Sequence, residues 1–371
     1  MRTFFDRSTR RRPLATQARG LLVAGLLAAA SHAATAQVET LDPRVISSSS
    51  ISGSDRSAIE SFVTAHAAGL TSDTFNNVRR SRTALLAPLA ESNATVSFRN
   101  AYADAIWPTI ESLLDADDAT RRLTGMRLAG MLGTDEAAGR LVDLLMSDDA
   151  GVRVFAAGRL GDTLSTVGPA AAAISPDAAA EIIDALGDAI ANDDEPRVAD
   201  AAVRALEQAM QIRPGLLNQA RARAIRVLSE SASERIAALG EGETAVEFSL
   251  RVCGVVRAAV STNDPVTTDA ARAAIAAGAD VLAGVVETYD ARQPATDEQI
   301  GLVSAAEATI FFARRQHAQA TNTPANFGAT NFAQTLQAEN LTERRDFRNN
   351  GVRFLQSLED DYDFEAGRFQ P

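Results

Sequence analysis

The chain has 371 residues, enough for a large hydrophobic core or an array of repeats, and its formal net charge is −12. Its 36 basic side chains are all arginine, because the sequence contains no lysine, and they face 48 acidic side chains. A balance this acidic repels phosphate backbones and anionic headgroups, so we expect no binding to nucleic acid or to a membrane surface.

Residues 1–36 predict a cleaved secretory signal peptide. Six arginines precede the apolar run 21–30, which is about half as long as the ~20 residues that a spanning helix needs. Small residues then end the segment at Ala36, so we expect cleavage between Ala36 and Gln37 and a periplasmic or secreted protein without a membrane span. Pro13 stands where a twin-arginine motif prefers a bulky apolar residue, which favours the general secretory route. A buried core helix or an uncleaved anchor is the alternative.

The rest of the chain predicts helices and no strands. Residues 37–54 are polar and serine-rich and indicate a flexible linker. Apolar residues then recur at helical spacing between Gly and Pro breakers. The predicted helices cover 55–69, 72–91, 95–115, 119–132, 134–146, 150–164, 176–191, 196–211, 215–238, 243–260, 266–290, 296–318 and 341–359. We group them into a solenoid over 55–318, a polar loop over 319–340, and a C-terminal helix with an aromatic tail over 341–371.

Residues 135–161 are the most informative stretch, because they predict two short amphipathic helices joined by an acidic turn. Each helix has one apolar stripe with spacings of three and four residues. The stripes contain Ala138, Leu141, Val142 and Leu145, then Val152, Phe155, Ala156 and Leu160. Such a pair cannot bury its stripe alone, so we expect it to stack on similar pairs.

A weak internal repeat supports this stacking. The segment 128–133 matches 156–161 at an offset of 28 residues, and a third copy around Ala202 follows the second at an offset of 46. Small residues in these segments would let neighbouring helices approach closely. A double acid precedes each copy, where it would cap a helix N-terminus. The double acids are Asp117-Asp118, Asp148-Asp149 and Asp193-Asp194.

The segment 148–153 (DDAGVR), with the small and apolar residues after it, resembles the second half of a HEAT repeat, an armadillo-type helical hairpin. The resemblance covers residues 118–212. It implies an all-α solenoid of helical hairpins and a role chiefly as a scaffold. It also implies a ladder of arginine and aspartate side chains from successive repeats, in which Arg153 is the best match, with Asp148 or Asp149.

Five arginines lie on or just before the second helices of the repeats, which usually line the concave face of a solenoid. They are Arg127, Arg153, Arg159, Arg197 and Arg204. Together they could bind an anion or a carboxylate through bidentate pairing. Pairing with the abundant carboxylates of the chain itself is the alternative.

Residue types that carry catalysis are scarce. His66 and His317 lie far apart in the sequence, and Cys253 is the only cysteine, so we expect no zinc site and no disulfide. Neither histidine lies near a strained nucleophile turn or a glycine-rich oxyanion loop. A chain without lysine cannot hold a P-loop. The sequence therefore predicts no catalytic residue, no cofactor and no metal.

These patterns favour an exported scaffold or adaptor that binds another envelope protein or peptide without catalysis. The alternative is an envelope enzyme or small-ligand binder whose site lies between the solenoid and the C-terminal region, around Arg314 and His317. A third possibility is a compact helical bundle with no partner groove. We expect the aromatic tail to cover the apolar end of the last repeat as a C-terminal helical cap, rather than hang free as a docking peptide.

Overall fold

The computed structural model describes residues 40–167, 173–212, 217, 219–240, 242–325 and 327–370. The predicted signal peptide, with Ala36 and Gln37, lies outside the described residues. All the helices below belong to one unit of the chain, Glu39–Pro371.

The described residues form helices and no strands, as predicted. The α-helices are α1 (Pro43–Ile46), α2 (Gly53–Ala67), α3 (Phe75–Leu86), α4 (Val96–Leu114), α5 (Ala119–Leu132), α6 (Asp135–Leu145), α7 (Ala150–Ser165), α8 (Pro176–Asn192), α9 (Pro196–Met210), α10 (Ala220–Leu239), α11 (Glu243–Val260), α12 (Thr268–Thr288), α13 (Asp297–Ala320), α14 (Phe332–Leu336) and α15 (Leu341–Asp361). Two 3-10 turns, η1 (Ala68–Thr71) and η2 (Pro88–Ala90), follow α2 and α3. Every helix range predicted from the sequence overlaps one of these α-helices.

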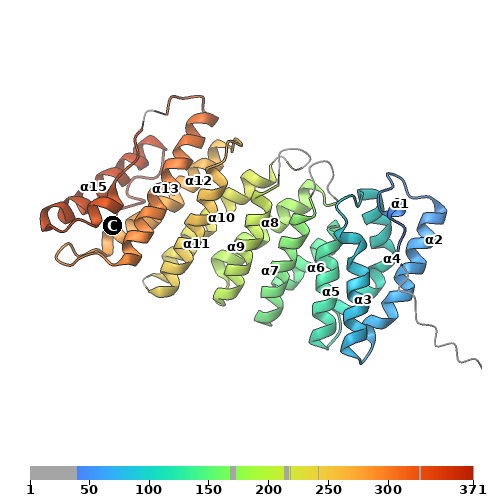
Figure 1. Ribbon diagram of the computed structural model, residues 1–371. Helices are drawn as coiled ribbons and strands as arrows, with labels where there is room; N and C mark the ends of the chain where they lie inside the picture. The colour runs from blue at the N-terminus through green and yellow to red at the C-terminus, as the bar shows by residue number, and fades with distance from the viewer. Residues whose placement is uncertain are drawn as a thin grey trace, which may run out of the picture. The chain divides into compact units, whose positions relative to one another are not determined.

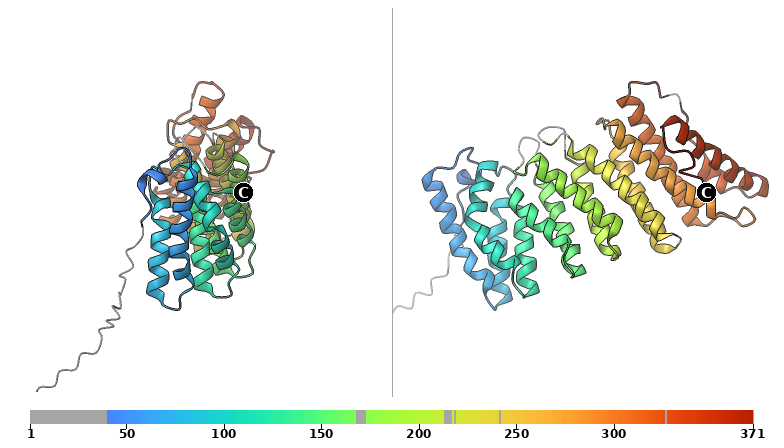
Figure 2. Two further views of the ribbon diagram at one scale, coloured as in Figure 1. Left: turned by 90° about the vertical axis from the view of Figure 1, so that its right-hand side faces the viewer. Right: turned by 180° about the vertical axis from the view of Figure 1, so that it is seen from behind.

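Successive helices pair into hairpins that stack side by side (Figures 1 and 2). The hairpins are α2/α3, α4/α5, α6/α7, α8/α9, α10/α11 and α12/α13. Their second helices form one continuous layer, because α3 contacts α5 and contacts continue through α7, α9 and α11 to α13. The predicted all-α solenoid of HEAT- or armadillo-like hairpins is confirmed. The alternative fold, a compact helical bundle, is not what the structure shows.

Carboxylates cap three of the second helices, α5, α7 and α9. The side chains of Asp118 and Asp149 accept hydrogen bonds from the first turns of α5 and α7, as the double acids predict. The third double acid behaves differently, because Glu195 caps α9. Asp193 instead ends α8 and accepts two hydrogen bonds from the guanidinium of Arg153 on α7. A double acid therefore predicts a helix boundary but does not tell which carboxylate is the cap.

Two glycines bring the second helices into close contact. A Cβ added to Gly130 on α5 would lie 2.8 Å from the carbonyl oxygen of Arg159 on α7. A Cβ added to Gly161 on α7 would lie 3.1 Å from the Cα of Ala205 on α9. Gly158, which occupies the position of Gly130 in the sequence repeat, has open space beside it. The small residues of the repeat thus serve close packing at only some of their positions.

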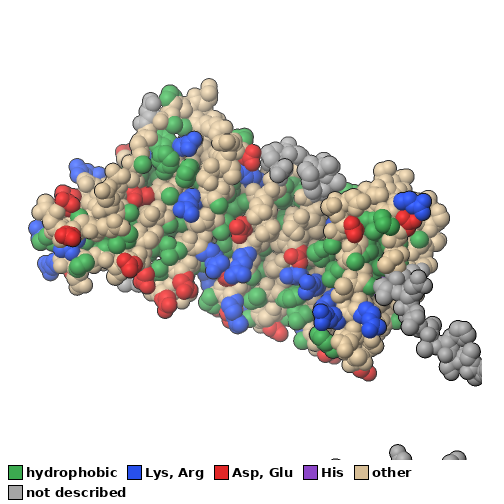
Figure 3. Space-filling view, viewed as in Figure 1, with side chains coloured by type: hydrophobic (Ala, Val, Ile, Leu, Met, Phe, Trp, Pro, Cys, Tyr) green, Lys and Arg blue, Asp and Glu red, His purple; other side chains and the backbone are tan. Residues whose placement is uncertain are grey.

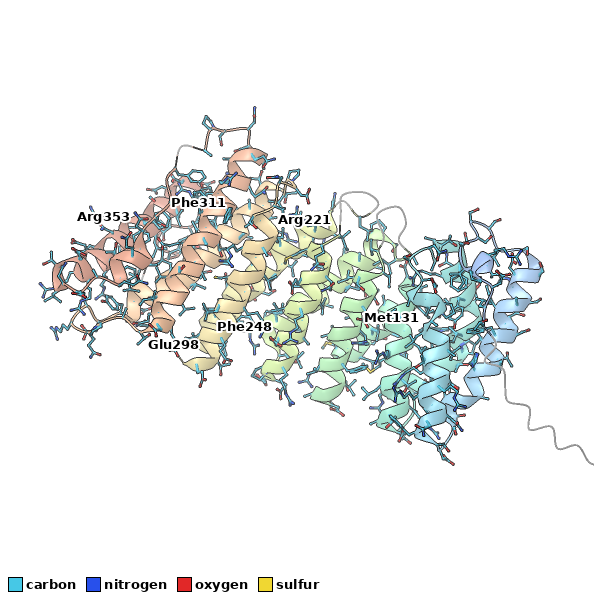
Figure 4. All side chains as sticks on the ribbon, viewed as in Figure 1. Met131, Arg221, Phe248, Glu298, Phe311 and Arg353 are labelled. Carbon is cyan, nitrogen blue, oxygen red and sulfur yellow. The ribbon has the colours of Figure 1, made fainter. Side chains whose placement is uncertain are left out.

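Buried arginines bind the carbonyl groups at the ends of neighbouring helices. Examples are the bonds from Arg99 to Met131 O (2.9 Å), from Arg221 to Ala259 O (2.6 Å) and from Arg235 to Ile190 O (3.0 Å). Arg221 is labelled in Figure 4. The last carbonyls of a helix have no partner within that helix, so a neighbouring repeat that buries them must supply donors.

The prediction of a flexible linker over 37–54 is wrong for residues 40–54. Leu41, Val45 and Ile46 are buried in the core, and residues 43–46 form α1. The backbone N–H of Thr95, at the start of α4, donates to the carbonyl of Ile46. Three buried apolar residues hold this segment on the core. Because serines dominate the composition of the segment, these three residues did not stand out in the sequence.

The predicted polar loop 319–340 also contains a helix, α14. Phe332 and Leu336 on α14 are buried, and α14 contacts α13 and α15. The carboxylate of Glu307 on α13 accepts hydrogen bonds from the backbone N–H groups of Phe332 (2.6 Å) and Ala333 (2.9 Å). This five-residue helix depends on a distant carboxylate, so the local sequence does not reveal it.

The C-terminal helical cap is confirmed. Helix α15 packs on α12, and a Cβ added to Gly351 of α15 would lie 2.7 Å from the side chain of Val286 on α12. The tail then folds back, because the buried carboxylate of Glu359 accepts hydrogen bonds from the N–H groups of Gly367 (2.9 Å) and Phe369 (2.8 Å). Phe369 is 1% exposed.

We expect opposite effects from the same substitution at the two equivalent glycines. Gly130→Ala should lower the free energy of unfolding by about 1–3 kcal/mol, because the methyl group would meet the backbone of α7. Gly158→Ala should raise it by about 0.5–1 kcal/mol, because alanine favours a helix and finds open space. Urea denaturation measures both, and equal effects at the two sites would contradict the α5–α7 packing.

A second prediction concerns the tail. Glu359→Ala leaves two backbone N–H groups without their acceptor and should lower the free energy of unfolding by about 1–3 kcal/mol. Asp360→Ala is the matched control, because Asp360 is the next residue and is exposed. Chemical denaturation gives the stabilities, and limited proteolysis should show earlier cleavage near 362–370 in the Glu359 variant alone. If both variants keep wild-type stability and cleavage, Glu359 does not hold the tail.

Candidate functional site

Three neighbouring helices of the second layer concentrate positive charge on an acidic chain. Helices α3, α5 and α7 together contain eight arginines and one acidic residue, Asp162. Helix α5 contacts both α3 and α7. In the space-filling view, basic side chains gather over this part of the layer (Figure 3). The arrangement makes a local anion-attracting surface despite the net charge of −12.

Arginine alternates with apolar side chains along the exposed ridge of each of these helices. We define the basic face as Phe75, Arg79, Arg82 and Leu86 of α3, Leu123, Arg127 and Met131 of α5, and Phe155 and Arg159 of α7. Each of these side chains is exposed or half-buried, and Phe75 is 65% exposed. The face therefore combines charge with apolar surface, as protein-binding surfaces commonly do.

The guanidinium groups of the basic face repel one another. Partial burial, followed by the charges of Arg127 and Arg79, lowers the pKa of Arg82. Burial lowers the pKa of Arg159 as well, and Arg127 adds to this effect while Asp162 opposes it. Among the described residues, no carboxylate forms an ion pair with Arg79, Arg82 or Arg127. An incoming carboxylate would relieve this repulsion.

Arg153 does not belong to the basic face. Its Nε and Nη2 atoms bind the two carboxylate oxygens of Asp193 at 2.6 and 2.9 Å. Its Nη1 donates to the backbone carbonyls of Ser147 (2.9 Å) and Asp148 (3.2 Å). One arginine–aspartate contact of the kind that the resemblance implies thus joins two successive repeats. Its acid is Asp193 of the next repeat, and not the side chain of Asp148 or Asp149 as expected.

Two more of the predicted arginines are neutralised by nearby carboxylates. Arg197 pairs with Glu195 at 2.8 Å on an exposed surface. Arg204 pairs with Asp200 at 2.8 Å, and the same carboxylate binds Arg251 of α11 at 2.7 Å. Intramolecular pairing, the alternative left open by the sequence, therefore describes α9 and α11.

Arg127 and Arg159 remain on the basic face. Arg159 pairs with Asp162 on its own helix and lies over the ring of Phe155, 4.8 Å from its centroid. Arg127 is exposed and has no carboxylate partner among the described residues. The five predicted arginines thus divide into three that are paired elsewhere and two that share one surface.

Sequence reasoning missed the arginines of α3. Arg79 and Arg82 lie before residue 118, where the HEAT-like segment starts, so no repeat position marked them. A signal was present in the composition, because α3 and α5 each hold three arginines and no acidic residue. Charge counted helix by helix would have found the basic face.

The alternative site around Arg314 and His317, between the solenoid and the C-terminal region, is filled by contacts of these two side chains with aromatic residues of the chain itself. Arg314 donates from Nε to the hydroxyl of Tyr362 (2.9 Å) and lies 4.3 Å from the ring centroid of Phe327. The ring of His317 packs on Tyr362 at 4.9 Å. Burial and the charge of Arg272 lower the pKa of His317, which favours the neutral imidazole at pH 7.

The remaining candidate groups show no catalytic arrangement. Cys253 is buried, and burial raises the pKa of its thiol to about 12, which keeps it protonated. Within the described ranges, no three His, Cys, Asp or Glu side chains are placed to hold a metal ion. No helix in that part of the chain is long and apolar enough to cross a membrane.

Comparisons with known proteins add little beyond the repeat architecture. No model of a known protein family matches the chain, and no curated protein does. Among solved structures, an engineered protein is 19% identical, with 68% of this chain and 97% of that chain covered and a TM-score of 0.40. A designed armadillo repeat protein is 13% identical (79% and 99% covered, TM-score 0.30). The Pds5–Scc1 complex structure is 10% identical (86% and 58% covered, TM-score 0.29).

The Arg153–Asp193 pair gives a pH-dependent prediction. The hydrogen bonds from Arg153 lower the pKa of Asp193, so its stabilising effect is present above the unfolded pKa of about 3.9 and is lost as the pH falls through the folded pKa. Asp193→Asn should lower the free energy of unfolding at pH 7 by about 1–3 kcal/mol. The difference from wild type should shrink below pH 4 in denaturation curves measured across pH. Asp194→Asn, at the exposed neighbour, is the control, and a pH-independent loss would refute the ion pair.

Proposed function

We propose that this chain is an exported helical-repeat scaffold that binds another protein of the cell envelope through its basic face and catalyses no reaction. The carrying observation is the row of guanidinium groups on α3, α5 and α7, of which Arg82 and Arg127 have no carboxylate partner among the described residues. Stacked hairpins commonly bind their partners along such continuous rows of helices. A helical-repeat fold is typical of protein-binding scaffolds.

The proposed location rests on the N-terminal sequence. A basic segment, a short apolar run and small residues ending at Ala36 support export and cleavage by signal peptidase. An exported protein meets envelope proteins and peptides, so the partner of the basic face would be one of these.

A cavity supports a second candidate function, the binding of a small ligand. It has a volume of about 280 Å³ and lies at the ends of α11 and α13, where Asn263, Arg315 and Gln316 line it. The amide of Gln316 is already committed, because its Nε2 donates to the carbonyls of Val260 (3.2 Å) and Thr262 (2.8 Å). The basic face is the stronger candidate because Arg79, Arg82 and Arg127 form no ion pair with a carboxylate among the described residues.

Two methionines allow a matched test of the scaffold proposal in the native host. Met131 lies on the basic face and is labelled in Figure 4, whereas Met146 ends α6 and is 84% exposed. A photo-crosslinking amino acid at position 131 should capture one defined envelope protein, and the same group at position 146 should not. N-terminal sequencing of the scaffold chain in the crosslinked product should start at Gln37.

Arg127→Glu, combined with the crosslinker at position 131, should abolish the captured product. Equal capture from positions 131 and 146, or capture that survives Arg127→Glu, would contradict binding through the basic face. An intact Met1 in a cytosolic fraction would overturn the proposed location.

A further inference from the structure

We infer, on the basis of the proposed function, that the basic face binds an extended acidic segment of the partner protein. This segment crosses α3, α5 and α7 with a carboxylate at every third residue and apolar side chains between the carboxylates. Arg82, Arg127 and Arg159 are the three successive binding positions, one on each helix.

The spacing follows from helix packing. Neighbouring packed helices lie about 8–10 Å apart. A segment in the extended polyproline II conformation repeats every three residues and advances about 3.1 Å per residue, so side chains three residues apart lie on one face about 9 Å apart and can meet successive helices. At Gly130 the helices α5 and α7 approach closely, since an added Cβ would lie 2.8 Å from the backbone oxygen of Arg159. A segment of about seven residues therefore spans the three helices.

Charge identifies the chemistry of the partner. Arginine binds carboxylates through two parallel hydrogen bonds, which a planar guanidinium offers without rearrangement. Arg82 and Arg127 have no competing carboxylate among the described residues, whereas Arg159 already pairs with Asp162. The first two positions of the segment should therefore depend more strongly on an acidic residue than the third.

The apolar members of the basic face favour a peptide over a bare polyanion. Leu86, Leu123, Met131 and Phe155 are half-buried and each lies four residues, about one turn, from an arginine of the basic face, and Phe75 is exposed. Apolar partner side chains on these positions would exclude water and strengthen the neighbouring ion pairs. A polyphosphate offers no such groups.

The basic face ends at α9, because α9 and α11 each contain two arginines and two acidic residues and so carry no net charge. On α9 and α11, Asp200 binds both Arg204 and Arg251. The face therefore offers three binding positions and not a row along the whole layer, which limits the length of the bound segment.

A second copy of the chain is the competing occupant. Helix α8 carries carboxylates at positions 177, 181, 184 and 188, along one face of the helix. Asp184 already pairs with Arg223, and two copies that each carry a net charge of −12 repel each other. These two facts favour a separate acidic partner.

The test uses the purified chain and fluorescein-labelled nine-residue peptides, measured by fluorescence anisotropy. The first peptide has aspartate at positions 2, 5 and 8 with leucine and serine between them. The second has the same composition with its three aspartates adjacent. The spaced peptide should bind at least tenfold more tightly, and added salt should weaken it.

Arg82→Glu and Arg127→Glu should each weaken binding of the spaced peptide at least tenfold, and Arg159→Glu should weaken it less. Arg292→Glu makes the same charge change in the exposed α12–α13 turn and should leave binding unchanged. Circular dichroism melting of every variant checks folding, which the exposed Arg127 and Arg292 should not disturb.

The outcomes separate this inference from the scaffold proposal. Equal affinity for the two peptides, full competition by polyphosphate, or salt-dependent dimerisation lost on Arg127→Glu would each overturn it. If crosslinking from position 131 captures a partner while no acidic peptide binds, the inference fails and the scaffold proposal stands. If the spaced peptide binds as expected while position 131 captures nothing, the inferred binding of an acidic segment is supported and the proposed binding of an envelope protein is contradicted.

Discussion

The stack of hairpins depends on guanidinium groups that connect one repeat to the next, and Asp193 is the centre of the clearest example. Its carboxylate binds Arg153 of α7, and its backbone carbonyl accepts a hydrogen bond from Arg235 of α10 at 2.8 Å. Because Asp193 ends α8, this residue ties three helices from successive hairpins. The carbonyls at a helix end must find donors when they are buried, and arginine, with five N–H groups, can reach several at once.

This use of arginine explains why the basic face is informative. In a chain without lysine, arginine serves both as a structural donor between repeats and as the source of surface charge. The side chains of Arg99, Arg153, Arg221 and Arg235 are committed to carbonyls or to a carboxylate. An arginine without such a partner adds little to stability, and the gathering of several on one surface is the observation that supports the proposed binding of a partner.

The sequence predicts the long helices well and the tertiary contacts poorly. Caps and breakers locate each helix from α2 to α13 because they act within one or two turns. Helices α1 and α14 were missed because four or five residues form a helix only when distant groups hold them, as Glu307 holds α14. The partner of Arg153 was misassigned for a similar reason. Asp193 lies 40 residues along the chain, and only the stacking of hairpins brings it to α7.

The same stacking places the candidate site in the N-terminal repeats. Near the other end of the chain, arginines are used to hold the tail: Arg314 binds Tyr362, Arg272 donates to the carbonyl of Asp363, and Arg368 lies 3.6 Å from Asp280. The aromatic rings that accompany them, such as Phe369, are buried with the tail. On the basic face, by contrast, Phe75 stays exposed one turn from Arg79. Arginine packs on aromatic rings where the C-terminal cap closes the solenoid, whereas on α3 the ring of Phe75 stays exposed, as the proposed binding of a partner requires.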